Sequence, residues 1–489
     1  MSLNLLNCSQ ADLARFALGT STALLSLACM ASGAAASVTI SSKATSNITC
    51  SSGVCTPSKK SAVLNVAQLE SLLAAGNVKV TTDASDIVVS AALTWASGSS
   101  LTLDAYRSIT IDEPVAVDGT GGLSLVTNDG GSGGALFFGA KGNVSFLSTS
   151  NNLTINGHAY TLVNDIATLA TDIAANASGY YALAASYNAI QDGSYASSPV
   201  SATFNGTFEG LGNAISHLTI DATSVTEFGL FTEVGSGGRI ENLGLRNVSI
   251  TGEHASSEIG GLAFANNGTL FNDFFSGKIV VNGGGPILGG LVAINSGVIS
   301  TCYAKGSVFA SHSSGTTYVG GLVGANSGFP TAGSITNSYA TGSVRAQRYA
   351  SAGGLVGFVY SGSISNSYAA ASVTSGKQSF IGGLIGETNG VNVISSYATG
   401  AVSGVNAGFV GGLIGKSAAT INYSYWDTTT SGITNLSQGA GNTSDDPGIT
   451  GVSSTQLEAG LPADFDPTIW GENASINGGL PYLLAIPPT

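Results

Sequence analysis

A pair of glycines followed by leucine recurs at an almost fixed interval in the second half of the chain. The first glycine of each pair lies at 260, 289, 320, 353, 382 and 411, so the spacings are 29, 31, 33, 29 and 29 residues. After each pair come a turn rich in glycine and asparagine, then an aliphatic residue four positions before an aromatic one. A period of this kind is the signature of stacked repeats.

The residue types within each unit predict strands. Glycine interrupts every few residues, and the apolar runs have the length of strands, whereas helical repeats need longer amphipathic stretches. Each unit fits one coil of a β-helix, with neighbouring coils about 4.8 Å apart. We therefore predict an all-β protein, a right-handed parallel β-helix (β-solenoid) with coils of about 30 residues.

Equivalent side chains of successive coils should stack above one another. The leucine of each Gly-Gly-Leu should fill the interior. Asn295 with Gly297, and Asn326 with Gly328, are expected at turns that need a positive φ. The aromatic position predicts a structural ladder of Phe274, Tyr303, Tyr339, Tyr368, Tyr397 and Tyr425.

Residues 320–344, GGLVGANSG through GSITNSYATGSV, resemble the GLUG motif, and similar copies cover about 200–426. The resemblance implies a large bacterial surface or secreted protein, such as the filamentous-haemagglutinin-like adhesins. GLUG repeats also accompany some metallopeptidases that cleave immunoglobulin A. Residues 37–200 resemble haemagglutinin-type β-helix exoproteins more loosely.

The chain divides into four predicted parts: a signal peptide at 1–36, a β-rich haemagglutinin-like β-helix region at 37–200, the GLUG-repeat β-helix at 201–426 and an irregular C-terminal cap at 427–489. A short helix is expected near 160–178.

The N-terminal apolar run predicts export. It follows Arg15 and ends in an Ala-x-Ala pattern, which places signal cleavage between Ala36 and Ser37. A retained membrane anchor and a lipoprotein attached at Cys29 are the alternatives. No later stretch is apolar enough to span a membrane, so the mature chain should lack a stable span.

Charge and cysteine content narrow the function further. The net charge of −13, with 15 Lys and Arg, argues against nucleic-acid binding. Cys50 and Cys55 flank a short loop and predict a disulfide in an oxidising compartment. Cys302 stands alone, at a position that the other repeats fill with serine. No cofactor or metal site is expected.

Catalytic motifs are weak. None of the four histidines lies in a His-Glu-x-x-His zinc motif. A polysaccharide-processing β-helix enzyme is the serious alternative, because such enzymes group carboxylates and basic residues on one face. The residues that could form such a group are Glu227, Glu233, Glu241, Glu253, Glu258, Asp273, Arg239 and Arg246.

We therefore expect a secreted or cell-surface bacterial adhesin-like protein without catalysis. Its partners would be an extracellular glycan or protein ligand and an outer-membrane exporter, and its location the outer cell surface or the medium. The turns at 310–318 and 345–352 break the period, so they should carry the contact specificity. A passive spacer is the third hypothesis.

Overall fold

The computed structural model describes residues 37–311, 315–328 and 331–488. The predicted signal peptide, including Ala36, lies outside these residues, as does the middle of the 310–318 turn. In the part of the chain that is described, no helix has the length and apolar character needed to cross a membrane.

The chain forms a parallel β-helix, as the repeat predicted. Among the described residues, the strands pair in parallel apart from three antiparallel pairs, β2 with β3, β14 with β15 and β52 with β53. One sheet runs the length of the molecule and contains β2 (Ile48–Ser51), β3 (Val54–Pro57), β5 (Val78–Thr81), β8 (Ser100–Asp104), β11 (Gly122–Val126), β14 (Asn152–Ile155), β15 (His158–Val163), β16 (Tyr180–Leu183), β19 (Thr207–Glu209), β24 (Arg239–Glu241), β28 (Thr269–Phe271), β32 (Val298–Ser300), β36 (Ser334–Thr336), β40 (Ser363–Ser365), β44 (Asn392–Ile394) and β49 (Thr420–Asn422).

The coils before the GLUG region, which we call the N-terminal coils, run through the long sheet and two small sheets. The first contains β4 (Ala62–Asn65), β1 (Val38–Ser41), β6 (Ile87–Val89), β9 (Ile109–Ile111) and β12 (Leu136–Phe138). The second contains β7 (Leu93–Trp95), β10 (Val115–Val117) and β13 (Val144–Phe146). Their inward side chains form an aliphatic core that also takes in Leu69 and Leu73 of helix α1 (Val66–Ala75).

The coils of residues 201–426, which we call the GLUG coils, run through the long sheet and three further sheets, and most of them have four strands. The sheet that follows the long one contains β17 (Tyr187–Asn188), β20 (Ala214–Ser216), β25 (Gly244–Gly252), β29 (Phe274–Val281), β33 (Tyr303–Ala310), β37 (Tyr339–Ala346), β41 (Tyr368–Ser375), β45 (Tyr397–Ala398), β50 (Ser424–Asp427) and β51 (Ile449–Val452), with β18 (Ser194–Tyr195), β21 (Thr219–Ala222) and β46 (Val402–Gly404) beside them.

The last two sheets meet at the Gly-Gly-Leu corner. The strands before the corner are β22 (Glu227–Phe228), β26 (Glu258–Gly260), β30 (Ile287–Gly289), β34 (Thr317–Gly320), β38 (Ala350–Gly353), β42 (Phe380–Gly382) and β47 (Phe409–Gly411). Those after it are β23 (Phe231–Val234), β27 (Ala263–Asn266), β31 (Val292–Asn295), β35 (Val323–Asn326), β39 (Val356–Val359), β43 (Ile385–Thr388) and β48 (Ile414–Lys416).

The corner explains why the glycine pair recurs. A Cβ on Gly289 would lie 1.9 Å from the Val292 carbonyl oxygen, and one on Gly290 would lie 2.2 Å from the Gly321 carbonyl oxygen. Both backbones approach neighbouring chain too closely for any side chain. The leucine that follows turns inward and is fully buried, as Leu291 and Leu322 show.

Another corner holds the left-handed residues, and here one prediction was wrong. Positive φ angles recur before β25, β29, β33, β37, β41, β45 and β50 of that sheet, at Asn242, Asn272, Thr301, Asn337, Asn366, Ser395 and Tyr423. Asn295 and Asn326, by contrast, end strands β31 and β35, and no left-handed φ occurs at them or at Gly297 and Gly328. Their side chains point inward instead.

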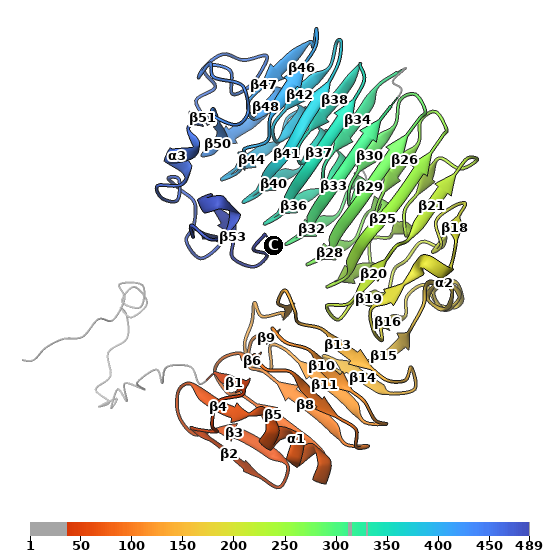
Figure 1. Cartoon of the computed structure of the whole chain (residues 1–489), viewed down its shortest axis with the longest axis vertical. Helices are drawn as coiled ribbons and strands as arrows, with labels where there is room; N and C mark the ends of the chain where they lie inside the picture. Colours follow the sequence, from red (N-terminus) through yellow and green to blue (C-terminus); the bar gives the residue numbers. More distant parts are fainter. Residues whose placement is uncertain (1–36, 312–314, 329–330, 489) are drawn as a thin grey trace, which may run out of the picture.

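Helix α2 (Ile166–Ala175) stands where the N-terminal coils give way to the GLUG coils (Figure 1). It begins at Asp165, whose carboxylate accepts a hydrogen bond from the Thr168 amide at 2.7 Å. Its residues Ile166, Leu169 and Ile173 are buried in the core of the GLUG coils. The helix lies within the predicted 160–178.

The C-terminal segment does more than close the end of the stack. Strand β51 adds to β50, and α3 (Ser454–Leu457) follows. The chain then turns back along the side of the GLUG coils, through the short pair β52 (Trp470–Gly471) and β53 (Tyr482–Leu483) (Figure 1). We call residues 458–488 the return segment.

Candidate binding site

The aromatic positions of the repeat lie one above another on the outer side of the coils. Ring centroids are 5.0 Å apart for Phe274 and Tyr303, 4.9 Å for Tyr303 and Tyr339, 4.8 Å for Tyr339 and Tyr368, and 5.0 Å for Tyr368 and Tyr397. Tyr425 is in register with Tyr397 and meets Phe465 edge-on. These rings form the ladder expected from their spacing.

The return segment covers the middle of this ladder. Trp470, Phe465 and Leu483 pack on Tyr339, Tyr368 and Tyr397, which are fully buried. The Tyr397 hydroxyl contacts the Pro481 carbonyl and accepts a hydrogen bond from the Asn477 side chain at 3.1 Å. The middle of the ladder is therefore a structural seam, closed to ligands.

Two polar columns run inside the GLUG coils. The Asn266 amide donates to the Asn295 Oδ1 at 2.8 Å, and the Asn295 amide donates to the Asn326 Oδ1 at 2.7 Å, all three side chains being fully buried. The signal was present in the sequence, because each asparagine follows its Gly-Gly pair at the same offset. Sequence reasoning assigned Asn295 and Asn326 to turns, because asparagine is common at turns as well as in buried columns.

The second polar column contains Cys302. Each serine hydroxyl of this column accepts a hydrogen bond from the equivalent amide of the preceding coil and donates to a carbonyl two residues back, as Ser367 does with Ser338 and Ser365. The Cys302 sulfur takes the same place, 3.4 Å from the Asp273 amide. Burial raises the pKa of the Cys302 thiol well above its usual range. A buried neutral thiol of this kind is unreactive.

Asp273 occupies the serine position in the coil before Cys302. Its Oδ1 accepts a hydrogen bond from the Leu243 amide at 2.9 Å, whereas its Oδ2 is buried without a partner among the described residues. Burial raises the pKa of the Asp273 carboxyl well above its usual range. Asp273 is thus a structural substitute for serine and is shut off from solvent.

The other acidic residues considered for catalysis do not converge. Glu233 accepts hydrogen bonds from Thr203 and Asn267 at 2.9 and 2.7 Å. Glu241 pairs with Arg239 of the same strand, on the long sheet.

The remaining members lie on other faces. Glu227 on β22 is in register with Glu258 on β26. Burial of Glu258 raises its pKa, and the nearby Glu227 charge raises it further. Glu253 is exposed on a turn, and Arg246 lies over the Phe274 ring. In the described residues, no three or more His, Cys, Asp or Glu side chains group as a metal site would require.

Glu209 is one of the buried carboxylates that sequence reasoning missed. It is in register with Glu241 of the next coil and is fully buried. It accepts hydrogen bonds from the Leu211 amide at 2.8 Å and the Asn242 side chain at 3.1 Å, and burial raises its pKa well above the usual range. Because water and substrate are excluded, it is a structural group. The early coil is too degenerate for the repeat to have identified it.

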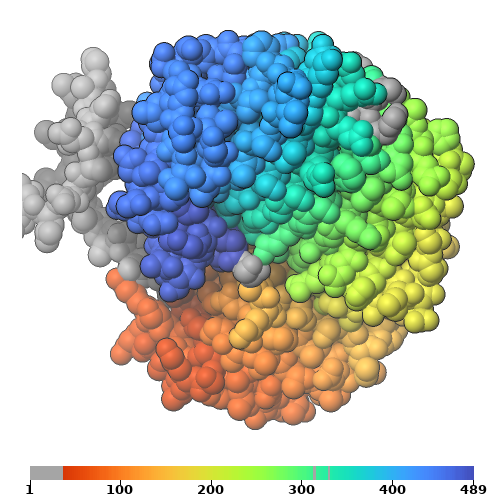
Figure 2. All heavy atoms as spheres, turned by 45° about the horizontal axis from the view of Figure 1, so that its top comes forward, coloured from red at the N-terminus to blue at the C-terminus, as the bar shows by residue number. Residues whose placement is uncertain are grey.

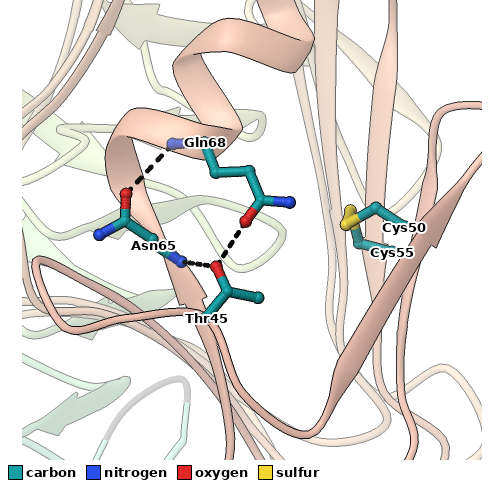
Figure 3. Close-up of a disulfide and its surroundings, with 5 residues drawn as sticks. All are labelled: Thr45, Cys50, Cys55, Asn65 and Gln68. Atoms are coloured by element: carbon teal, nitrogen blue, oxygen red, sulfur yellow. Dashed lines mark hydrogen bonds between the residues drawn. A yellow bond between two sulfur atoms is a disulfide. The ribbon is translucent and has the colours of Figure 1, made fainter.

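Cys50 and Cys55 lie directly opposite each other on the antiparallel strands β2 and β3 and form a disulfide (Figure 3). Near them, Thr45 contacts the start of helix α1. Its hydroxyl accepts a hydrogen bond from the Asn65 amide at 3.0 Å and donates one to the Gln68 side chain at 2.5 Å. The disulfide ties the first hairpin of the stack.

The described ends of the two turns singled out by their length line part of a surface pocket of about 400 Å³. We call it the loop pocket. It is lined by Gly315, Thr316, Tyr349, Ala350, Ser351, Gln378, Phe380 and Glu387. The first two residues belong to the earlier turn, Tyr349 to Ser351 to the later one, and the rest to the next coil.

Stacked corners hold the loop pocket in shape. Tyr349, Gln378 and Asn406 all have left-handed φ angles, at equivalent corners of successive coils. The Tyr349 amide donates to the Lys377 carbonyl at 3.0 Å, and the Gln378 amide donates to the Asn406 carbonyl at 3.0 Å. Backbone hydrogen bonds thus position side chains that point away from the coils.

The loop pocket combines exposed aromatic rings with a fixed carboxylate. Glu387 accepts a hydrogen bond from the Ser351 hydroxyl at 2.8 Å and pairs with Lys416 at 2.8 Å. The Lys416 ammonium lies 4.7 Å from the centre of the Phe380 ring. Tyr349 is 43% exposed and Phe409, beside Phe380, is 38% exposed. The loop pocket thus presents aromatic side chains beside a carboxylate that Lys416 already pairs.

Comparison with known proteins identifies the repeat. The family model of the GLUG motif matches residues 315–345 and 349–374. Halomucin of Haloquadratum walsbyi is 40% identical over 97 residues, which are 20% of this chain and 1% of halomucin. The chain thus matches only a small part of that relative.

A solved structure of a candidate immunoglobulin A1 protease from Bacteroides ovatus is also similar, with 20% identity, a TM-score of 0.42, and coverage of 67% of this chain and 93% of that one. A likeness at this level carries no argument about activity. The motif match and the stacked coils together show that this chain carries GLUG repeats.

Proposed function

We propose that this chain is an adhesin-like protein of the cell surface or the extracellular medium, which binds a glycan in the loop pocket and does not cleave it. The observation that carries the proposal is the position of the two long turns. They interrupt the repeat on consecutive coils, and their described ends line part of one pocket with exposed aromatic side chains. Surface loops held by a rigid scaffold are where binding residues concentrate.

The lining of the loop pocket favours a sugar. Aromatic side chains such as Tyr349 and Phe380 offer apolar surface, and Gln378 and Glu387 offer hydrogen-bonding groups beside them. A sugar ring presents the same mixture of apolar faces and hydroxyl groups. A protein ligand remains the other outcome of the test below.

Three features support a location outside the cytoplasm. The predicted signal peptide at 1–36 would direct export, with cleavage before Ser37. The disulfide between Cys50 and Cys55 fits an oxidising compartment. GLUG repeats and the likeness to halomucin agree with a surface or secreted protein.

The test is a glycan and matrix-protein array probed with the full chain and two variants. Tyr349→Ala removes the exposed ring of the loop pocket. Tyr423→Ala is the matched control, because Tyr423 is also exposed and left-handed but lies outside the pocket. The masses of the bound glycans are measured by mass spectrometry to detect cleavage.

We expect saturable binding of a glycan class that Tyr349→Ala weakens about tenfold and Tyr423→Ala leaves unchanged, since a central aromatic contact contributes about 1–2 kcal/mol. Shortened sugars would instead favour the polysaccharide-processing enzyme. Binding of matrix proteins alone would replace the glycan with a protein ligand. Absence of binding to every glycan and protein on the array would favour the passive-spacer hypothesis.

A further inference from the structure

A second and larger hollow lies away from the loop pocket, where the N-terminal coils face the GLUG coils. It has a volume of about 1060 Å³. We call it the cleft. One wall comes from strands β9 and β12 and the chain after them, the opposite wall from β25, β29 and β33, and the end of the return segment closes one side. In Figure 2 the dark blue end of the chain lies where the orange and green coils meet.

The GLUG wall of the cleft contains two cations placed over aromatic rings. The Arg246 guanidinium lies 5.1 Å from the centre of the Phe274 ring, and the Lys305 ammonium lies 5.7 Å from the centre of the Tyr303 ring. These rings are the first two of the aromatic ladder, and the return segment leaves them half-buried. Each cation is therefore held near a rigid surface and directed toward the cleft.

The two cations are close enough to repel each other. Burial lowers the pKa of Lys305, and the nearby Arg246 charge lowers it further. No carboxylate of the described residues lies within ion-pair distance of Arg246, whereas Lys79, Arg107, Lys141, Arg239 and Lys416 each have one. Like charges gathered in a chain of net charge −13 are stabilised by an anion bound between them.

The other polar groups of the cleft suit hydroxyl groups. Asn247 and Ser276 line the GLUG wall, and Asp112 lies on the opposite one. The carboxylate of Asp112 can accept hydrogen bonds from the hydroxyl groups of a ligand. The cleft is also at the upper end of the volumes that enclose drug-sized ligands, so it accommodates several sugar units.

From this arrangement we propose that the cleft binds an acidic glycan, with its carboxylate or sulfate groups at Arg246 and Lys305 and its hydroxyl groups toward Asp112. The site is separate from the loop pocket and does not depend on it. Carboxylated and sulfated sugars share the chemistry that the two cations recognise, and the experiment distinguishes them.

Isothermal titration calorimetry with the full chain tests the proposal. The probes are tetragalacturonate, a heparin-derived tetrasaccharide, the neutral cellotetraose and a hexaglutamate peptide. The variants are Arg246→Gln and Lys305→Gln. Lys278→Gln is the matched control, because it removes the same charge from strand β29 at an exposed position outside the cleft. Thermal unfolding of each variant checks that the fold is intact.

We expect at least one acidic tetrasaccharide to bind, more weakly as salt is added, and cellotetraose to bind at least tenfold more weakly. Arg246→Gln and Lys305→Gln should each weaken binding about tenfold or more, because each removes a charge-assisted hydrogen bond. Lys278→Gln and Tyr349→Ala should bind as the unaltered chain does.

Four results would overturn the proposal: no saturable binding of either acidic sugar, equal binding of cellotetraose, tighter binding of hexaglutamate, or acidic-sugar binding that Tyr349→Ala abolishes and Arg246→Gln leaves intact. The last result would assign the acidic sugar to the loop pocket. Failure of the array experiment with Tyr349→Ala, in turn, leaves the cleft proposal standing.

Discussion

The N-terminal coils and the GLUG coils share one long sheet but hold their register in different ways. In the N-terminal coils, Ile87 stacks on Ile109 and Ile109 on Leu136 across loops of unequal length, within an aliphatic core. A hairpin with a disulfide and helix α1 complete that region.

The GLUG coils instead repeat three columns that allow only one alignment. The asparagine column, the serine column and the aromatic ladder each pair identical or similar side chains in successive coils. A slip of one residue would place asparagine amides against apolar side chains and leave them without partners. Register is thus fixed by aliphatic burial and covalent linkage in the first region, and by specific columns in the second.

We expect Tyr368→Ala to destabilise the GLUG coils more than any other variant considered below. Tyr368 is fully buried, stacked between two tyrosines and packed against Trp470. Its removal leaves a cavity in the ladder, and we expect the free energy of unfolding of the GLUG coils to fall by about 3–5 kcal/mol. Urea unfolding followed by tryptophan fluorescence measures the change. A loss below about 1 kcal/mol would show that the ladder is dispensable.

Disrupting the asparagine column should cause the next largest loss of stability. Asn295→Ala removes the acceptor of the Asn266 amide and the donor to Asn326, so two fully buried groups lose a partner. We expect a loss of about 2–4 kcal/mol, measured by the same unfolding experiment. Asn152→Ala, on an exposed position of the N-terminal coils, is the control and should change the stability by less than about 0.5 kcal/mol.

Asp273→Ser should stabilise the GLUG coils at neutral pH, because it restores the serine column. Burial raises the pKa of the folded Asp273 carboxyl, although the hydrogen bond from the Leu243 amide opposes this. The neutral carboxyl therefore stabilises the fold fully below about pH 4, where the unfolded chain is also protonated. That stabilisation is lost as the pH rises toward the raised folded pKa.

At pH 7 we expect Asp273→Ser to be about 1–3 kcal/mol more stable than the unaltered chain, with the difference shrinking as the pH falls to about 4. Urea unfolding at both pH values measures it. A difference that stays constant between them would contradict a buried neutral carboxyl.

The smallest effects distinguish two tyrosines of the ladder. Tyr397→Phe removes a hydroxyl that contacts Pro481 and accepts from Asn477, so we expect a loss of about 1–2 kcal/mol. The Tyr368 hydroxyl is buried without a partner among the described residues, so Tyr368→Phe should be neutral or slightly stabilising. Thermal unfolding of both variants provides the measurement, and the reverse order would contradict the contacts of the return segment.

Much of the GLUG half could be predicted from the sequence because it repeats. Recurrence of Gly-Gly-Leu indicated the coils, and the fixed offset of tyrosine indicated the ladder. Asn295 and Asn326 were misplaced because the same residue type serves both turns and buried columns. The path of the return segment depends on contacts between Trp470, Phe465 and the ladder, which no local pattern encodes.

The candidate site was predictable only in part. The two long turns stood out because they break the period. Phe380 and Glu387, which complete the loop pocket, belong to the next coil and look like ordinary repeat residues in the sequence. The cleft could not be foreseen, since it depends on how Arg246 and Lys305 face Asp112 across a bend in the molecule.

Hydrogen exchange of the full chain and of Tyr368→Ala, followed by mass spectrometry, tests most directly whether the columns hold the GLUG coils and the loops between them. We predict faster exchange from about residue 303 to 425, including the edges of the loop pocket at Thr316 and Tyr349, with residues 38–155 unchanged. An equal increase in both regions, or none in either, would contradict it.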